Sequence, residues 1–196
     1  MKTNSLKLLL VVVFGIALAG CPAAPRPTYP EIRFTNEPKL MLGVASIEVS
    51  EEYKPSYRSP NVEHIFPVPP VKALENWAHD RLQAVGSTGR ARLVIRDASV
   101  VEVELRKKTE GVAGVFTNDP TERYDAAMEA TIDILDDHGL SVRNASARMI
   151  RSQSVLEGIT PNEREKIWYE LTQQLAQDFD KQMELQMRSH LAPYLQ

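Results

Sequence analysis

The sequence predicts an α+β fold, a two-layer sandwich in which an antiparallel sheet of about four strands carries two helices on one face. Apolar and polar residues alternate with a period of two through residues 123–134, and again through residues 144–149 of a strand predicted over 140–156, as in a sheet with one buried and one wet face. Apolar residues recur at spacings of three and four in residues 71–85 and 160–193, as in helices packed on such a sheet. The order β-α-β-β-β-α, ending in a long helix, forms a single domain over residues 39–196.

The predicted domain begins with a strand over residues 39–49, followed by a long loop. Leu40 to Val49 form a short, apolar and partly β-branched run, which is typical of a buried strand. Residues 50–70 then contain five prolines. A loop of this length is usually functional or disordered. It is either a contact surface or a strap across the edge of the sheet.

The first helix is predicted over residues 71–85. Pro70 suits a first helical turn, and Gly86 suits a C-terminal stop. One face carries the apolar residues Leu74, Trp77, Ala78, Leu82 and Val85. His79 and Asp80 are adjacent and point to different sides of the helix, so we interpret them as solvated residues rather than a catalytic pair.

Three strands are predicted to follow this helix. The first covers residues 93–106 and is interrupted at residues 97–99, which indicates a bulge or bend. The second covers residues 123–134 and the third residues 140–156, joined by a turn in which Gly139 can take a positive φ. Acidic residues and a histidine precede Gly139, but turns commonly collect such residues, and we expect no metal site there.

The last helix is predicted over residues 160–193, with a capping box in which Thr160 is the N-cap. About 32 helical residues span about 48 Å, whereas an ordinary strand is about 20 Å long. The helix should therefore overhang the sheet and bury Met183, Met187 and Leu191 elsewhere. The loop over residues 50–70, a second copy of the chain or a partner protein would cover them, unless a kink wraps the helix over the sheet edge.

The connection over residues 110–120 joins two of the predicted strands and is unusually apolar. It carries Val112, Val115 and Phe116, and Gly111 and Gly114 make it flexible. Exposed apolar loops tend to mark contact sites, so these residues are candidates for binding a partner or lipid. The alternative is that the segment folds back onto the core or extends a twisted hairpin.

The N-terminus has the anatomy of a secretory signal peptide over residues 1–20. Two lysines precede the apolar run of residues 8–16, which is shorter than the roughly 20 residues needed to span a bilayer. Leu18-Ala19-Gly20-Cys21 resembles the lipobox of bacterial lipoproteins. That resemblance implies cleavage before Cys21, a diacylglyceryl thioether on its sulfur and acylation of the new amino terminus. The alternatives are a plain signal peptide or a short membrane anchor.

Residues 21–38 are predicted to form the lipidated cysteine and a proline-rich stalk. Five prolines in residues 22–38 favour an extended spacer without helix or sheet. Pro22 follows the cysteine directly. By resemblance to the sorting of Gram-negative lipoproteins, a residue other than aspartate at that position implies the outer membrane, with the domain facing the periplasm.

The composition excludes several classes of function. Residues 1–20 hold two lysines and no acidic residue, so the mature chain has 21 basic and 26 acidic side chains and a net charge of −5. This balance gives no attraction toward nucleic acid. Cys21 is the only cysteine, and the four histidines show no ligand spacing. Catalytic and phosphate-binding motifs are absent from the sequence, so we expect no enzyme activity, no metal and no cofactor.

The element order behind a lipobox resembles two groups of small Gram-negative lipoproteins. One comprises the auxiliary lipoproteins of ABC-type lipid transport systems, including the paraquat-inducible family. The other is the lipoprotein of the lipopolysaccharide-assembly translocon. The resemblance covers most of the mature chain but transfers no functional residue. It implies a non-catalytic envelope lipoprotein that acts as tether, scaffold or auxiliary subunit for a protein or lipid partner. The alternative is a small periplasmic lipid- or glycan-binding module with its ligand between helix and sheet.

Overall fold

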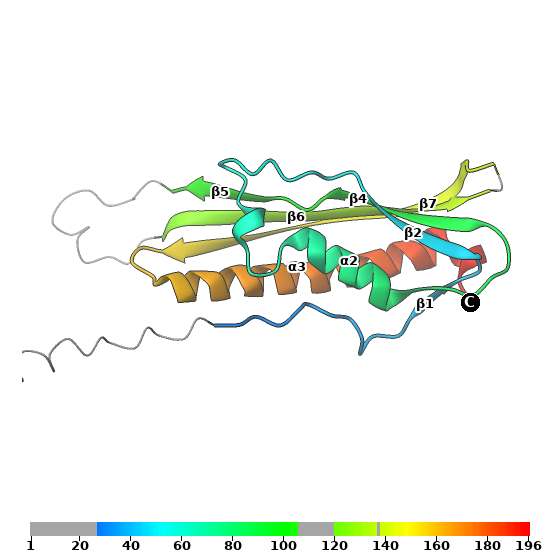
Figure 1. Ribbon diagram of the computed structural model, residues 1–196, viewed down its shortest axis with the longest axis horizontal. Coiled ribbons are helices and arrows are strands. Elements are labelled where there is room, and N and C mark those ends of the chain that lie inside the picture. Colours follow the sequence, from blue (N-terminus) through cyan, green and yellow to red (C-terminus); the bar gives the residue numbers. More distant parts are fainter. Residues whose placement is uncertain (1–26, 106–119, 137) are drawn as a thin grey trace, which may run out of the picture.

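The computed structural model describes residues 27–105, 120–136 and 138–196, which form an α+β fold (Figure 1). The main sheet of this part of the chain has five strands, and two helices cover one of its faces. The strands of this sheet are β2 (Ser46–Glu51), β4 (Arg90–Asp97), β5 (Val100–Glu104), β6 (Pro120–Leu135) and β7 (Ser141–Leu156). The helices are α2 (Pro70–Arg81) and α3 (Pro161–His190), with short 3-10 turns at η1 (Glu63–Ile65) and η3 (Ala192–Tyr194).

Strand β6 is the centre of the sheet, and its predicted period of two is confirmed. It pairs with β7 antiparallel along its whole length, while β4 and β5 pair with its second and first halves. Its even-numbered residues face the helices and are at most 2% exposed: Tyr124, Ala126, Met128, Ala130, Ile132 and Ile134. In β7, Ala145 and Ala147 face the same way and are buried. The sheet therefore has one apolar face, which the helices cover.

The prediction of one strand over residues 39–49 is wrong. The chain forms β1 (Leu40–Leu42), turns at Gly43 and continues as β2 in a different sheet. Strand β1 pairs with β3 (Leu82–Ala84), and β2 pairs with β4. Both pairings are parallel, because a helix or long loop separates the paired strands in sequence. The main sheet is therefore mixed rather than purely antiparallel.

The first helix is shorter than predicted. It ends at Arg81, and Leu82 takes extended dihedral angles (φ −93°, ψ 136°) to begin β3. The apolar spacing of Leu82 matched the helix, but pairing with β1 determines its conformation. Gly86 does not cap the helix. A Cβ atom there would lie 2.5 Å from the backbone of Gly43, so a side chain at position 86 would collide with the β1–β2 turn.

The interruption predicted at residues 97–99 separates β4 from β5. The side chain of Asp97 accepts a hydrogen bond from the backbone N–H of Ser99 at 3.0 Å, and the pairing register with β6 shifts between Ile95 and Asp97. Residues 93–106 are therefore not one strand. The bend brings β5 back beside the first half of β6.

Helix α3 confirms the predicted capping box, but it does not overhang the sheet. Thr160 accepts a hydrogen bond from the N–H of Glu163, whose carboxylate accepts one from the N–H of Thr160. The helix has 30 residues, or about 45 Å, and β6 and β7 have 16 residues each, or about 53 Å. The sheet is thus long enough to cover the helix. Met183 and Met187 are fully buried in the chain's own core, so neither is available to a partner or a second copy.

The proline-rich loop over residues 50–70 is the predicted strap, anchored on β5. Asn61 forms an antiparallel bridge with Val101, and Val62 and Phe66 are buried. Glu63, only 1% exposed, accepts hydrogen bonds from the Tyr53 hydroxyl at 2.8 Å and from the backbone N–H of Val100 at 3.3 Å. These bonds satisfy a buried carboxylate and hold the strap on the sheet edge.

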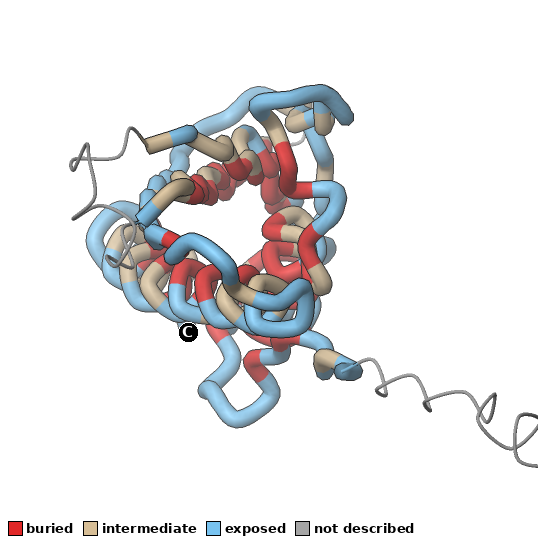
Figure 2. The backbone as a smooth tube through the Cα atoms, turned by 90° about the vertical axis from the view of Figure 1, so that its left-hand side faces the viewer, coloured by how far each residue is buried: buried red, intermediate tan, exposed pale blue. Residues whose placement is uncertain are grey.

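The core is continuous from one end of the elongated molecule to the other. Figure 2 shows buried residues along the inside of the sheet and helices, with exposed residues outside. In the described ranges, no helix combines the length and the apolar character that a membrane crossing requires.

Candidate functional site

The N-terminal segment, residues 27–38, packs against both helices. Ile32 and Phe34 belong to the hydrophobic core, and the side chain of Asn76 donates to the carbonyl oxygen of Ile32 at 3.2 Å. The prediction of a free spacer is therefore wrong for this part of residues 22–38. The prolines favour an extended backbone, as expected. In addition, the apolar side chains of Ile32 and Phe34, two positions apart, lie on the same side of this backbone and are buried against α2.

Arg33 and Asp80 fasten this segment to α2. The Arg33 Nε and Nη2 atoms donate to the Asp80 carboxylate at 2.7 and 2.5 Å, and the N–H of Phe34 donates at 2.9 Å. Asp80 is buried, so its interpretation as a solvated residue is wrong, whereas the side chain of His79 is 81% exposed as expected. The Arg33 guanidinium is the main cause that holds the pKa of Asp80 well below its usual range.

Replacing Asp80 with asparagine is expected to cost about 1–3 kcal/mol of folding stability near neutral pH. Because the folded pKa of Asp80 lies below the unfolded value of about 3.9, its ionic contribution is fully present above about pH 4. That contribution declines as the pH falls from the unfolded toward the folded pKa, so the difference in stability between the two proteins should be smaller near pH 2 than at neutral pH. Urea unfolding at neutral pH and near pH 2 measures the free energy of unfolding of wild type and Asp80→Asn. The exposed variant Glu48→Gln is the control. A constant difference between wild type and Asp80→Asn would contradict this prediction.

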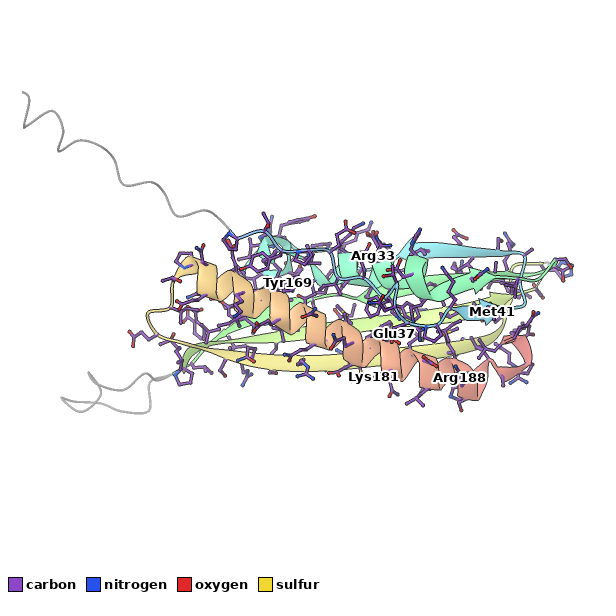
Figure 3. The ribbon with its side chains drawn as sticks, turned by 90° about the horizontal axis from the view of Figure 1, so that it is seen from below. Arg33, Glu37, Met41, Tyr169, Lys181 and Arg188 are labelled. Carbon is purple, nitrogen blue, oxygen red and sulfur yellow. The ribbon has the colours of Figure 1, made fainter. Side chains whose placement is uncertain are left out.

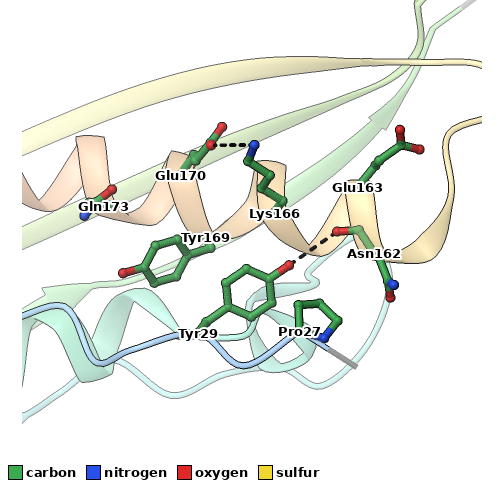
Figure 4. Close-up of a pocket in the computed structure, with 8 residues that line it drawn as sticks. All are labelled: Pro27, Tyr29, Asn162, Glu163, Lys166, Tyr169, Glu170 and Gln173. Carbon is green, nitrogen blue, oxygen red and sulfur yellow. Dashed lines mark hydrogen bonds and ion pairs between the residues drawn. The ribbon is translucent and has the colours of Figure 1, made fainter. Parts of the chain in front are cut away.

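A hollow of about 540 Å³ lies where the N-terminal segment meets the first turns of α3. Figure 4 shows its lining, with the rings of Tyr29 and Tyr169 side by side. Their centroids are 5.2 Å apart, and the Tyr29 hydroxyl donates to the carbonyl oxygen of Asn162 at 3.3 Å. The polar lining comes from α3: Asn162, Glu163, Lys166, Glu170 and Gln173.

A second hollow of about 400 Å³ continues from the first along the N-terminal segment. Both are lined by Tyr169 and Gln173, and the second extends to Glu37 and Gln177. We call the two together the tyrosine groove. Its wall opposite α3 is the N-terminal segment, and Arg33, Glu37 and Tyr169 lie along it in Figure 3.

The tyrosine groove is acidic. Its lining includes four carboxylates, from Glu31, Glu37, Glu163 and Glu170. The lining has two cations. Arg33 is bonded to Asp80 and lies 3.4 Å from Glu31, and Lys166 lies 3.8 Å from Glu170. Burial raises the pKa of Tyr29, and the negative charges of Glu165 and Glu170 raise it further. The field at the ring pair is therefore negative.

The groove lies at the end of the molecule from which the N-terminus leaves. Pro120 pairs with Leu156 just before α3 begins, so the β5–β6 connection also leaves from this end (Figure 1). Cys21 and the predicted contact residues Val112, Val115 and Phe116 lie outside the described residues. The described ranges hold no cluster of metal-binding side chains. Sequence reasoning missed the groove, although a tyrosine in a supposed spacer was a signal that the segment packs.

No family model and no curated protein matches the chain. Among solved structures, it is similar to a minor lipoprotein from Acinetobacter baumannii, with 12% identity over 74% of this chain and 93% of that one and a TM-score of 0.39. A candidate lipoprotein from Caulobacter crescentus CB15 shows 16% identity over 75% and 90%, with a TM-score of 0.39. A Xanthomonas campestris protein of family DUF330 shows 8% identity over 83% and 92%, with a TM-score of 0.32. Similarity at this level assigns neither a family nor a function.

Proposed function

We propose that the protein is a non-catalytic lipoprotein of the bacterial envelope that, anchored through Cys21, holds a partner protein close to the membrane. It would act as tether, scaffold or auxiliary subunit of a transport or assembly system, and its place would be the periplasmic side of the outer membrane. The lipobox-like residues 18–21 and Pro22 support the anchor and the address.

The observation that carries this proposal is the fixed N-terminal segment. Six peptide units separate Cys21 from Pro27, so the two residues are at most about 22 Å apart. Ile32 and Phe34 are part of the core, and Arg33 is bonded to Asp80. A lipid on Cys21 would therefore hold one particular end of the domain beside the bilayer. A tether requires such a fixed orientation, whereas a carrier that diffuses freely does not require it.

The apolar β5–β6 connection supports the same orientation. The ends of this connection, at Glu104 and Pro120, lie at the end of the molecule nearest Pro27. Val112, Val115 and Phe116 follow one of these ends in sequence and precede the other, and we propose that they contact lipid or a membrane-bound partner.

The alternative of a ligand between helix and sheet has less support. That space is filled by side chains, of which Trp77, Tyr124 and Phe179 are fully buried. The rings of Trp77 and Phe179 meet edge to face at 5.3 Å, so a lipid or sugar would have to displace packed core residues.

The experiment labels cells with palmitate and purifies a C-terminally tagged full chain after envelope crosslinking. We expect the label on wild type and none on Cys21→Ala, sedimentation with the outer membrane, and one companion protein in constant ratio. Val115→Ser/Phe116→Ser should keep the label and lose most of the companion, because two apolar contacts are removed.

The matched control is Ile150→Ser/Leu185→Ser, which changes two exposed apolar residues on β7 and α3. It should retain the companion. Absence of palmitate from wild type would refute the anchor. Absence of any stoichiometric companion would refute the tether.

A further inference from the structure

The tyrosine groove has the dimensions of a site for an extended peptide. Residues 27–34 form one wall and rise for roughly 26 Å if fully extended. The other wall is the exposed side of α3 from Asn162 to Gln177. A segment of about eight residues would lie along this length. The groove is open to solvent, so it suits a chain laid across the surface rather than an enclosed small molecule.

The charges in the groove determine which chain fits. Glu31, Glu37 and Glu170 are exposed. Glu31 lies 3.4 Å from Arg33 and Glu170 lies 3.8 Å from Lys166, but Arg33 is also bonded to Asp80, so the acidic groups outnumber the two cations. An anionic lipid head group or an acidic peptide would be repelled. Lysine and arginine side chains would be attracted. Because the groove stays wet, these side chains would keep much of their hydration, and the desolvation cost of binding them would be small.

The ring pair adds a contact that charge alone does not give. Tyr29 and Tyr169 are tilted by 32° to each other and are only partly buried. Cations are attracted to the faces of aromatic rings, and Glu165 and Glu170 strengthen the negative field there. A guanidinium group would meet ring faces and carboxylates together.

We propose that the tyrosine groove binds an extended, arginine- or lysine-bearing segment of the partner protein, next to the membrane anchor. This inference rests on the proposed tether function and names the surface and the chemistry of its partner. The groove and the β5–β6 connection consist of different residues, so different variants test the two contacts.

The test uses full-length lipidated protein in non-ionic detergent and a fluorescein-labelled octapeptide of alternating arginine and serine. Fluorescence anisotropy measures its affinity at low and near-physiological ionic strength. We expect it to bind at least about tenfold more tightly than the same peptide with glutamate in place of arginine, and to weaken with salt.

Two charge-reversal variants with equal net charge separate the groove from general attraction. Glu37→Lys/Glu170→Lys should weaken peptide binding about tenfold, whereas Glu48→Lys/Glu104→Lys, on exposed positions of β2 and β5, should change it less than about twofold. Tyr169→Leu keeps an apolar side chain, loses the ring face and should weaken binding several-fold. Equal losses in the two charge-reversal variants, unchanged affinity in Tyr169→Leu, or no binding to wild type would each overturn the inference.

The result is distinguishable from the fate of the tether itself. If the companion protein co-purifies but the octapeptide does not bind, the tether stands and the groove is not its docking site. If the peptide binds specifically but no companion exists, the groove is a basic-peptide site and the tether function fails.

Discussion

Replacing Arg81 with methionine is expected to lower the free energy of unfolding by about 3–5 kcal/mol. Arg81 is 1% exposed and joins the two helices: its Nε donates to Asp180 at 2.6 Å, and its Nη2 donates to Glu184. Asp180 is also buried and accepts a hydrogen bond from Trp77 Nε1 at 2.8 Å. Without Arg81, the negative charge of Asp180 would stay buried without a counter-ion. Urea unfolding followed by circular dichroism measures the loss.

The matched control is Arg188→Met. Arg188 pairs with the same Glu184, but its side chain is 62% exposed. Exposed ion pairs contribute little, so this variant should lose less than about 1 kcal/mol. Adding Asp180→Asn to Arg81→Met should recover part of the loss, because the double variant no longer buries an unpaired charge. Equal effects of Arg81→Met and Arg188→Met would show that burial does not determine the cost.

Truncation of Met183 or Met187 to alanine is expected to destabilise the fold by about 2–5 kcal/mol for each residue. Both side chains are completely buried in the core, so each truncation removes apolar contacts and leaves a cavity. The same experiment distinguishes a core residue from an interface residue. A residue that served only a partner would leave the unfolding of the isolated chain unchanged.

Leu185, between these two methionines on α3, provides the control. It is 61% exposed, so Leu185→Ala should change the free energy of unfolding by no more than about 0.5 kcal/mol. Thermal unfolding in dilute protein, repeated over a range of concentrations, completes the comparison. If the destabilisation caused by Met183→Ala disappeared at low protein concentration, Met183 would belong to an interface between subunits instead of the core.

Local patterns were sufficient to predict elements whose partners are close in sequence. The alternation in residues 123–134 and 144–149 predicted β6 and β7, because the two strands pair directly and one face of β6 is buried from Tyr124 to Ile134. The capping box at Thr160 predicted the start of α3, since those hydrogen bonds lie within four residues. The interruption at residues 97–99 was also visible locally.

Local patterns gave wrong predictions where contacts with a distant segment determine the conformation of a residue. Leu82 fits the apolar stripe of α2, but pairing with Leu40 on β1 makes it a strand residue. The overhang of α3 rested on strands of ordinary length, whereas β6 and β7 have 16 residues each. For the candidate site, the sequence predicted the anchor at Cys21 and an apolar connection. It did not predict the groove, because Tyr29 and Tyr169 are 140 positions apart and meet only in the fold.

The amino-acid sequence by itself determined the fold class, the exposed and buried faces of the central strand and the start of the long helix, because those depend on periodicity and on hydrogen bonds between near neighbours. Only the tertiary structure decided that residues 27–38 belong to the domain, that the helical methionines are core, and that an acidic groove lies beside the outgoing chain. Each of these depends on side chains brought together across the sequence, such as Arg33 with Asp80, and burial is a property of that assembly rather than of either residue alone.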